Sequence, residues 1–411
     1  MKEDFLQMVW QQQLHTLPAE TTDGLKIQVI KPGIRNHNDG PDFGNARIVM
    51  DGLEWNGAVE IHVRADEWNL HGHQHDPAYE GVILHVVWEQ NKAVFRKDGS
   101  QVPTFELRER IPLGIILRYR EIISAKDNLA CQPFLGQMEP VLISSMLDKV
   151  LIERLENRAA EILREHPQNG FDWILSSACL LAKCLGMKGN EEPMVNLVQN
   201  LPARFLHGAK ENENKILACL LGLGGFLENP GEEKQKQLKE EYKTLCAGYE
   251  LKPFKILWKK SGMRPGSFPE KRIRHLAKFL VHLPEMLASF ENGAPVETLL
   301  PVLMGKQQAQ KKDGFLERHL LVNFLAPLLV AKGLHSGNQE IILAAADLVH
   351  GQKAEENSSS RLLISAGMQI KTAGESQAGK ELYTQYCQKK RCLECMIGAH
   401  IIGRGPEAGF T

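Results

Sequence analysis

The hydrophobic pattern of the chain changes its period once, and this change limits the fold more than any other feature. Between residues 25 and 107, short apolar runs rich in β-branched residues alternate with Gly, Pro, Asn and Asp, as in "LKIQVIKPG", "NARIVMDG" and "GVILHVVWE". Such punctuated runs predict strands and turns. From about Pro140 onward, Leu, Ile, Val and Phe recur at helical spacing, as in "PEKRIRHLAKFLVHLPEMLASF". The chain therefore combines a sheet with a large helical region.

Three segments of the sheet region give more detailed expectations. The stretch "NARIVMDGLEWNGAVEIHV" predicts two antiparallel strands joined by a turn near Asp51-Gly52 or Asn56-Gly57. The nearly continuous apolar run "GVILHVVWE" is typical of a central strand covered on both faces. The opening segment places Phe5, Met8 and Val9, and then Gln12, on one stripe, which predicts an amphipathic helix over this sheet.

The size of the chain favours several domains. Its 411 residues exceed what one hydrophobic core usually holds, and 43% of them are hydrophobic. We expect an α+β protein in three parts: residues 1–135 as an α/β domain with a metal site, residues 136–350 as a larger all-α domain, and residues 351–411 as a linker and a cysteine-containing segment packed on the rest. The N-terminal sheet should be mixed or antiparallel, with a flanking helix.

Charge and segment composition exclude some partners. The 49 basic and 50 acidic residues leave a net charge of -1, so any polyanion would have to bind a local patch. The first residues, "MKEDFLQMVWQQQL", lack the apolar run of a signal peptide, and no stretch approaches the roughly 20 apolar residues of a membrane span. We therefore expect a cytoplasmic protein with reduced cysteines and no membrane partner.

Polar residues on one predicted hairpin suggest a metal site. Glu60 and His62 stand two apart on a strand, so both side chains project from one face, with Ile61 on the other. Asp42 follows Gly40-Pro41, where the chain turns into the preceding strand, and can bring a second carboxylate beside Glu60. Two carboxylates and a nitrogen base suit a divalent cation such as magnesium or manganese. We therefore expect Asp42 and Glu60 to bind such a metal.

The order Pro41-Asp42, hairpin, Glu60-Ile61-His62 resembles the PD-(D/E)xK nuclease superfamily over roughly residues 1–110. The resemblance implies a restriction-endonuclease-like fold in which Asp42 and Glu60 hold the metal, and in which Glu3 is a candidate for an additional acidic residue. His62 replaces the usual lysine, so it would orient or deprotonate the water that attacks a phosphodiester, without a permanent positive charge. The alternative is that these residues are hydrogen-bonded structural polar groups.

The segment "LHGHQHDPAY", residues 70–79, offers a second source of ligands. Imidazoles suit zinc and other transition metals, so a site could use His71 and His73, joined by Asp66, His75, Asp76 or His85. Its "HGHQHD" differs in its last two residues from the His-x-His-x-Asp-His motif of the metallo-β-lactamase fold. The alternative is a solvated loop whose histidines cap strand ends or bind phosphate.

His85 lies inside "VILHVV", a predicted buried strand, where an unpaired imidazole is costly. A lone buried histidine is usually a hydrogen-bonded core residue. Pairing of this strand with the strand of Glu60 and His62 would bring the three side chains into one cleft if the register permits it. Under that condition we expect His85 to be a further metal ligand.

The C-terminal segment "CQKKRCLECMIGAH" holds Cys387, Cys392 and Cys395, followed by His400. Three thiols and an imidazole can complete a tetrahedral zinc site, and a CxxC pair is the usual half of one. Four ligands within one short segment would strain that geometry if the segment is helical. The alternative is a set of packed thiols without a metal.

A basic concentration surrounds a proline-containing turn in "LWKKSGMRPGSFPEKRIRHLAKF". Arg264 and Arg272, with Trp258 nearby, would suit DNA or RNA, since cations contact phosphates and aromatic rings stack on bases. The alternative is a helix N-terminus with a solvated basic face.

Several separated motifs, "IKPGIRNHNDGPDFGNARI", "GAVEIHVRADEWNLHGHQHDPAYEGVILHVVW", "RPGSFPEKRI" and "RCLECMIGAHII", extend over nearly the whole chain. Together they resemble the domain of unknown function 2851 family of uncharacterised bacterial proteins, as found in Bacteroidetes, which carries no assigned activity. From the residues we expect a metal-dependent phosphodiesterase, nuclease-like and acting on nucleic acid, whose helical domain presents the substrate. Two alternatives stay open: a non-enzymatic nucleic-acid-binding or assembly module, and a zinc-dependent hydrolase that uses His71 and His73.

Overall fold

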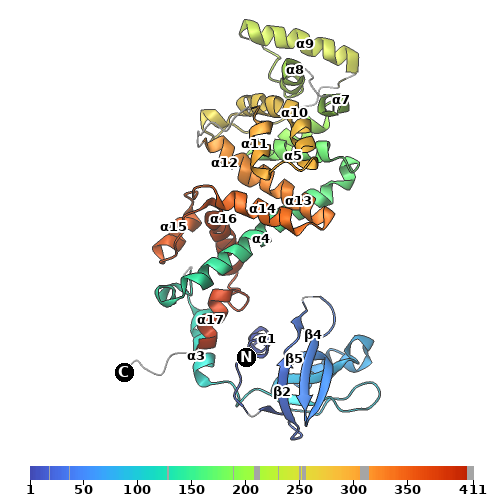
Figure 1. The fold of residues 1–411 in the computed structure, drawn as a ribbon, viewed down its shortest axis with the longest axis vertical. Helices are drawn as coiled ribbons and strands as arrows, with labels where there is room; N and C mark the ends of the chain where they lie inside the picture. Colours follow the sequence, from blue (N-terminus) through green and yellow to red (C-terminus); the bar gives the residue numbers. More distant parts are fainter. Residues whose placement is uncertain are drawn as a thin grey trace. The chain divides into compact units, whose positions relative to one another are not determined.

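The computed structural model describes residues 1–17, 19–36, 38–126, 129–187, 189–207, 213–229, 231–249, 251, 256–305 and 314–404. Its fold is α+β, as predicted, with a seven-stranded mixed sheet near the N-terminus and many helices beyond it (Figure 1). The chain divides into two compact units. Unit 1 consists of Met1–Leu147, Arg361–Gln369 and Lys380–Thr411, and unit 2 of Asp148–Ser360 and Ile370–Gly379.

The division between the units differs in detail from the expected domains. The first boundary follows Leu147, inside the long helix α4 (Pro140–Glu165), whereas the sequence suggests residue 135. The expected C-terminal part is divided, because residues 351–360 and Ile370–Gly379 belong to unit 2 and the rest to unit 1. A helical hydrophobic period continues unchanged through α4, so it cannot mark a boundary within that helix.

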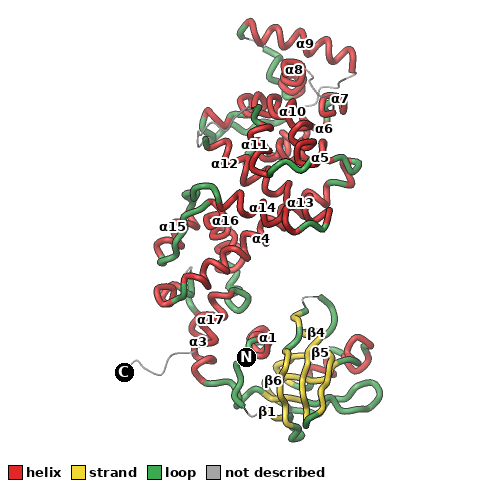
Figure 2. The backbone as a smooth tube through the Cα atoms, in the orientation of Figure 1, coloured by secondary structure: helices red, strands yellow, loops and turns green. Residues whose placement is uncertain are grey.

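Seven strands form the sheet of unit 1 (Figure 2): β1 (Ala19–Glu20), β2 (Lys26–Lys31), β3 (Ile34–Arg35), β4 (Phe43–Met50), β5 (Leu53–Arg64), β6 (Val82–Glu89) and β7 (Thr104–Glu106). Their order is β1-β2-β4-β5-β6-β7, and β3 pairs with β4. The pairs from β1 to β5 are antiparallel, whereas β6 runs parallel to both β5 and β7. The antiparallel and parallel parts of the sheet therefore meet at β5.

The turn between β4 and β5 lies at Asp51 and Gly52, the first of the two expected positions. Both residues have positive φ, 46° and 83°, as a type I′ hairpin turn requires. Asn56-Gly57 lies inside β5 instead. A Cβ on Gly57 would lie 2.5 Å from Cγ2 of Ile83, so glycine is needed where β6 passes close to β5.

Unit 1 also contains helices that come before and after the sheet in the sequence. The N-terminal helix α1 (Glu3–Gln11) packs against β5 and buries Phe5, Met8 and Val9 as predicted, although Gln12 is exposed. The central strand β6 is buried along most of its length, also as predicted. The helix α3 (Leu113–Ser124) packs against α17 (Met396–Arg404), so the C-terminal helix lies beside the segment that follows the sheet (Figure 1).

Unit 2 is built from helices: most of α4, then α5 (Trp173–Gly186), α6 (Glu191–Gln199), α7 (Ala203–His207), α8 (Glu213–Leu223), α9 (Glu233–Tyr249), α10 (Pro269–Glu291), α11 (Val296–Leu303), α12 (Phe315–Leu320), α13 (Ala326–Ser336), α14 (Gln339–His350), and parts of α15 (Ser358–Ser365) and α16 (Ala373–Glu381). The helix α10 packs against α5, α8 and α11. Within the described ranges, no helix has both the length and the apolar character of a membrane span.

Candidate metal centre

One face of β5 carries the two polar residues that the sequence places together. Glu60 and His62 are only 5% and 2% exposed. Parallel pairing sets Glu60 opposite His85 of β6, which is fully buried. Nδ1 of His62 lies 2.8 Å from Nε2 of His85, a hydrogen bond in which one ring donates to the other. The register therefore brings these three side chains together, as the sequence requires for a common cleft.

The connection between β5 and β6 brings further histidines to this face. It contains α2 (Glu67–Leu70) and two 3-10 turns, His73–His75 and Pro77–Tyr79. Gly72, with φ 79°, turns the chain between His71 and His73. The ring of His73 stacks on that of Tyr79, with centroids 3.8 Å apart. The ring of His73 also stacks on that of His62, with centroids 5.3 Å apart, and this contact holds the connection over β5.

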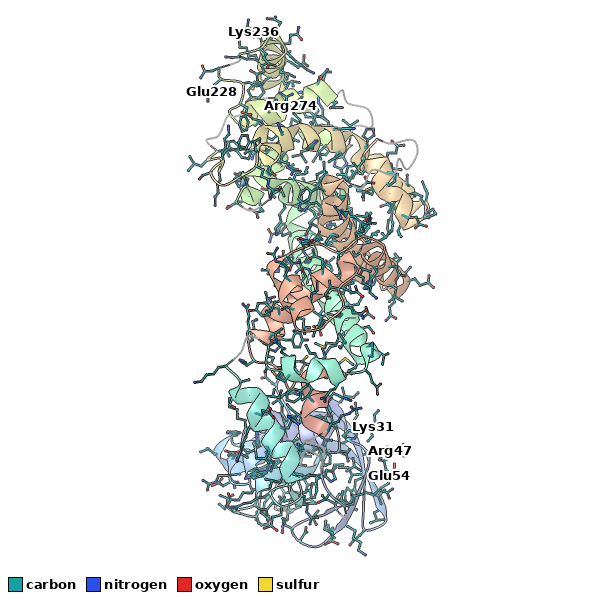
Figure 3. The ribbon with its side chains drawn as sticks, turned by 90° about the vertical axis from the view of Figure 1, so that its left-hand side faces the viewer. Lys31, Arg47, Glu54, Glu228, Lys236 and Arg274 are labelled. Carbon is teal, nitrogen blue, oxygen red and sulfur yellow. The ribbon has the colours of Figure 1, made fainter. Side chains whose placement is uncertain are left out.

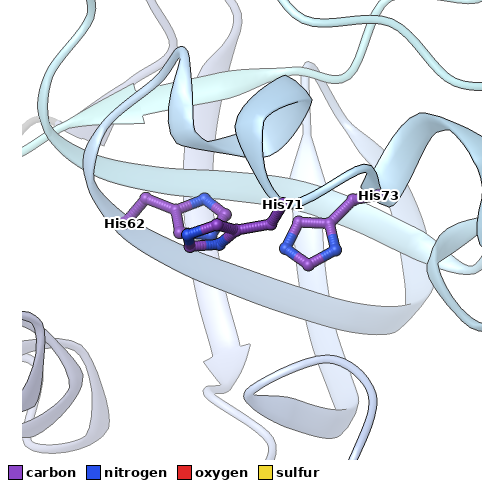
Figure 4. A group of neighbouring side chains, drawn as sticks. All are labelled: His62, His71 and His73. Atoms are coloured by element: carbon purple, nitrogen blue, oxygen red, sulfur yellow. The ribbon is translucent and has the colours of Figure 1, made fainter.

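His62, His71 and His73 form the closest set of metal-binding atoms (Figure 4). One ring nitrogen of each lies within 4.8 Å of the others, and no other group of three or more such His, Cys, Asp or Glu atoms occurs among the described residues. Oε1 of Glu60 is 3.5 Å from Nε2 of His62 and 3.4 Å from Nε2 of His73, both longer than an ordinary hydrogen bond. Three imidazole nitrogens therefore meet in one small space, and Oε1 of Glu60 lies beside two of them.

A second layer of hydrogen bonds holds the carboxyl groups. The backbone N–H of Asp42 donates to Oε2 of Glu60 at 3.0 Å, and the N–H of Ile61 donates to Oδ2 of Asp42 at 3.0 Å. Gln7 of α1 donates from Nε2 to Oδ1 of Asp42 at 2.8 Å and to Oε1 of Glu3 at 3.2 Å. The helix and the hairpin thereby bring three carboxyl groups into one cluster.

Burial and mutual repulsion make these carboxyl groups hard to ionise. Burial, followed by the charge of Asp42, raises the pKa of Glu60 to about 9. The same two causes, in the same order, raise the pKa of Glu3 to about 7. Burial also raises the pKa of Asp42, although hydrogen bonds from Ile61 and Gln7 oppose it. A nearby cation would relieve this repulsion.

The pKa values of the imidazoles shift in the opposite direction, because burial disfavours the charged form of any group. Burial, reinforced by neighbouring imidazoles, lowers the pKa of His62 to about 2, of His73 to about 4 and of His85 to about 3. These rings are therefore neutral at neutral pH, and the neutral ring is the form that binds metals.

The expected metal ligands do not all occupy equivalent places. Glu60, His71 and His73 face the space beside His62, whereas His85 contacts His62 from within the sheet and is not part of the close set. Asp42 belongs to the hydrogen-bonded layer around Glu60. The register condition for His85 is met, but its contact is with another histidine, which makes it a positioning residue.

Other residues near His71 and His73 are solvent-exposed or make structural contacts. His75 is exposed, and the Asp76 carboxylate caps the following turn by accepting from the N–H of Ala78 at 2.9 Å. Asp66 pairs with Arg64 at 3.1 Å. Sequence reasoning missed Gln7, whose only signal is its spacing of one helical turn from Glu3.

The residues expected to bind nucleic acid lie in unit 2. Arg264 is exposed. Arg272 is only 5% exposed and donates from Nη2 to Oγ of Ser267 at 3.3 Å, so it is not available to a phosphate backbone. Nε1 of Trp258 donates to the carbonyl of Gly224 at 2.9 Å, which fixes the ring against its own unit. Of the three, Arg264 alone keeps the exposure that the prediction needs.

Of the four expected zinc ligands, three lie together in unit 1. Cys387, Cys392 and Cys395 line one pocket, but His400, on α17, is not among the lining residues. The pKa of His400 is lowered by burial and then by Arg404, with Glu139 acting against them. Cys131, and not His400, is the fourth metal-binding side chain that lines this pocket.

Fold and site define an α+β protein with a cluster of histidines and carboxyl groups, largely buried but exposed at His71 and partly exposed at His73, at the junction of the antiparallel and parallel strands. The chain belongs to the family described as Protein of unknown function (DUF2851), whose model matches residues 3–358. The resemblance to this family is thus confirmed, whereas the resemblance to PD-(D/E)xK nucleases stays a prediction. Comparisons with curated proteins and with solved structures find no match.

Proposed function

We propose that this protein is a metal-dependent phosphodiesterase that cleaves nucleic acid, with its catalytic centre in unit 1. The observation that carries the proposal is the meeting of three imidazole nitrogens within 4.8 Å of one another beside Oε1 of Glu60. The chain order of the supporting groups adds to it. Glu3 on α1, Asp42 before β4, and Glu60 with His62 on β5 follow the order that the nuclease resemblance implies.

The donor set fits a transition metal. Three neutral imidazoles suit manganese or zinc better than magnesium, which prefers oxygen ligands. When Nδ1 of His62 donates to His85, its Nε2 is left as a ligand atom, the usual arrangement in metal-binding histidines. The clustered carboxyl groups, which raise one another's pKa, are surroundings that a cation stabilises. Manganese or zinc is therefore the preferred metal.

The residues of the site can share the proton transfers. A bound cation supplies Lewis-acid polarisation and neutralises charge on the phosphate. With a cation bound nearby, Glu60 would be ionised and its Oε1 could accept a proton from the attacking water, because Oε2 is held by the N–H of Asp42. Glu3, whose pKa is about 7, returns a proton to the leaving oxygen. In this scheme His62 is a ligand, and Glu60 takes the role of base that the sequence suggests for His62.

The proposal is tested by metal analysis of the purified protein, followed by cleavage assays on single- and double-stranded DNA and RNA with manganese, zinc or magnesium. We expect bound metal and cleavage that depends on it. Glu60→Gln should remove cleavage while keeping the fold. Glu54→Gln is the matched control, because Glu54 lies on the same strand but is exposed and pairs with Arg47 at 3.0 Å (Figure 3).

The outcomes separate the possible functions. Cleavage that needs no metal, or that persists in Glu60→Gln, contradicts the proposal. Salt-sensitive binding of nucleic acid without turnover would identify a binding module instead. Metal that is lost in a His71→Ala/His73→Ala double variant would assign it to the imidazoles, and metal that is retained there would refute that assignment.

A further inference from the structure

Four cysteines of unit 1 line one pocket, although one of them is far from the others in the sequence. Cys131 lies in the segment after α3, whereas Cys387, Cys392 and Cys395 precede α17. Cys395 is buried, and the other three are partly buried. Since α3 packs against α17, the two segments are brought together by a helix pair.

The backbone around the three C-terminal cysteines is shaped to turn them toward one space. Cys387 ends a stretch of π-helix, Leu382–Cys387, a form found often at functional sites. Lys390, with φ 55°, reverses the chain between Cys387 and Cys392. Gly398 also lines the pocket, and a Cβ there would lie 2.3 Å from the carbonyl oxygen of Cys392. The glycine thus lets the cysteine loop lie directly on α17.

The thiols are near enough to influence one another's ionisation. Burial, followed by Cys395 and Cys392, raises the pKa of Cys131 to about 12. Burial, followed by Cys131 and the other two cysteines, raises the pKa of Cys387 as well. Lys390 acts in the opposite direction on Cys387 and Cys392. A metal bound to these sulfurs would take the place of their protons.

We propose that Cys131, Cys387, Cys392 and Cys395 bind one metal centre through four thiolates. On binding, each thiol releases its proton to solvent and donates a sulfur electron pair to the metal. Cys131 takes the position that the sequence suggests for His400. The centre joins the segment after the sheet to the C-terminal segment, and it does not rest on the proposed catalytic function.

Two occupants share this chemistry, an iron–sulfur cluster and a zinc ion. The spacing Cys-x4-Cys-x2-Cys is also that of plant-type [2Fe–2S] proteins, in which the fourth cysteine follows the run, whereas Cys131 precedes it here. Within the described ranges, no three of these sulfurs lie within 4.8 Å of one another. A tetrahedral zinc site with Zn–S distances of about 2.3 Å needs sulfurs roughly 3.8 Å apart. The wider spacing of the sulfurs favours the iron–sulfur cluster. The experiment below distinguishes the cluster from zinc.

The test is analysis of iron, acid-labile sulfide and zinc in the full-length protein, purified without oxygen, together with X-ray absorption at the metal edge. The His71→Ala/His73→Ala background keeps the histidine centre out of the measurement. We expect one centre per chain with a sulfur-only first shell: iron with sulfide for the cluster, or zinc without sulfide for the ion. Cys131→Ser should remove most of this metal, whereas Cys179→Ser, at a buried thiol of unit 2, and His400→Ala should retain it.

Neither metal in the purified protein, a first shell of nitrogen or oxygen, or full metal content in Cys131→Ser would overturn the proposal. If Cys131→Ser does not fold, the absorption spectrum of the unsubstituted cysteines decides the ligand set. That measurement needs no variant of this pocket. Loss of the centre in the histidine double variant alone would likewise contradict a separate cysteine site.

Discussion

Two places in the molecule, one in each unit, bury polar side chains in different ways. In unit 2, Asn190 is 1% exposed, but its Nδ2 donates to the carbonyl of Lys259 at 2.9 Å and its Oδ1 accepts from the N–H of Lys259 at 2.9 Å. In unit 1, Nε2 of His73 and Nδ1 of His85 are buried without a hydrogen-bond partner among the described residues. Next to them, burial and then neighbouring carboxyl groups raise the pKa of Glu60.

This difference separates polar groups that serve the fold from groups that await a ligand. A buried amide whose donors and acceptors are paired within the protein stabilises one backbone arrangement. Buried histidine nitrogens that lack a hydrogen-bond partner, and buried carboxyl groups crowded against one another, cost stability until something binds them. Substitutions in the two places should therefore have opposite effects on stability and on binding.

The largest effect is expected for Glu60→Gln. Cleavage should fall by about 10²–10⁴-fold, the usual contribution of a general base. Stability of the metal-free protein should stay level or rise, because the amide removes a carboxyl group that the fold disfavours in its charged form. Single-turnover cleavage and urea unfolding measure the two quantities. A variant that loses stability and keeps its activity would place Glu60 with the structural residues.

The next effect is a fall in stability of the metal-free protein as the pH rises. Glu60 has an ordinary pKa of 4.5 and a folded pKa of about 9, so between these values the unfolded chain releases a proton that the folded chain retains. Stability should therefore fall over this window, by at most about 1.4 kcal/mol per pH unit from this group.

The buried histidines have the opposite dependence, and only at lower pH. The folded pKa values of His62, His73 and His85 lie below the ordinary 6.5, so these residues reduce stability as the pH falls below that value. Urea unfolding in the presence of a chelator, between pH 6.5 and 9, should thus isolate the carboxyl effect. An equal slope in Glu60→Gln would assign that effect to other groups.

A smaller effect is expected for Asn190→Ala in unit 2. The change removes two hydrogen bonds to the backbone of Lys259 and leaves buried groups unpaired, which should cost about 2 kcal/mol of unfolding free energy. Asn200→Ala, at an exposed helix end, is the control and should change little. Metal content and cleavage should stay constant in both variants. A loss of metal in Asn190→Ala would remove the contrast between these two places.

The smallest effect is expected for Gln7→Leu, which acts on the site through Asp42. Gln7 donates to Asp42 and accepts from Nη2 of Arg35 at 2.6 Å. Its loss therefore removes a hydrogen bond that holds the Asp42 carboxyl group, without removing a metal ligand. Metal affinity, measured by calorimetric titration, should fall by about tenfold, as for other residues that orient ligands. Gln11→Leu, at an exposed position of the same helix, should leave it unchanged.

Much of the sheet could be predicted because its information is local. Alternation places Glu60 and His62 on one face of a strand whatever the rest of the chain does, and Asp51-Gly52 is a strong hairpin turn. The grouping of His71 and His73 with His62 depends on how the connection to β6 folds back, and no periodicity describes that.

Other features depended on long-range packing or on the face of a helix. Cys131 lies far in sequence from the cysteines that it joins, so no spacing motif includes it. Arg272 belongs to a segment rich in basic residues, but it lies on the buried side of α10. Charge composition reports how many cations a segment has and says nothing about which face of its helix they occupy.

The parallel pairing of β5 with β6 also orders events in time. An antiparallel hairpin such as β4 and β5 closes through a two-residue turn, whereas β6 can join β5 only after residues 65–81 have been looped across. His71 and His73 are carried on that loop. Non-local pairings of this kind form slowly. We therefore expect a newly made chain to complete its sheet before it can hold a cation at the histidines, so that loading with metal follows folding.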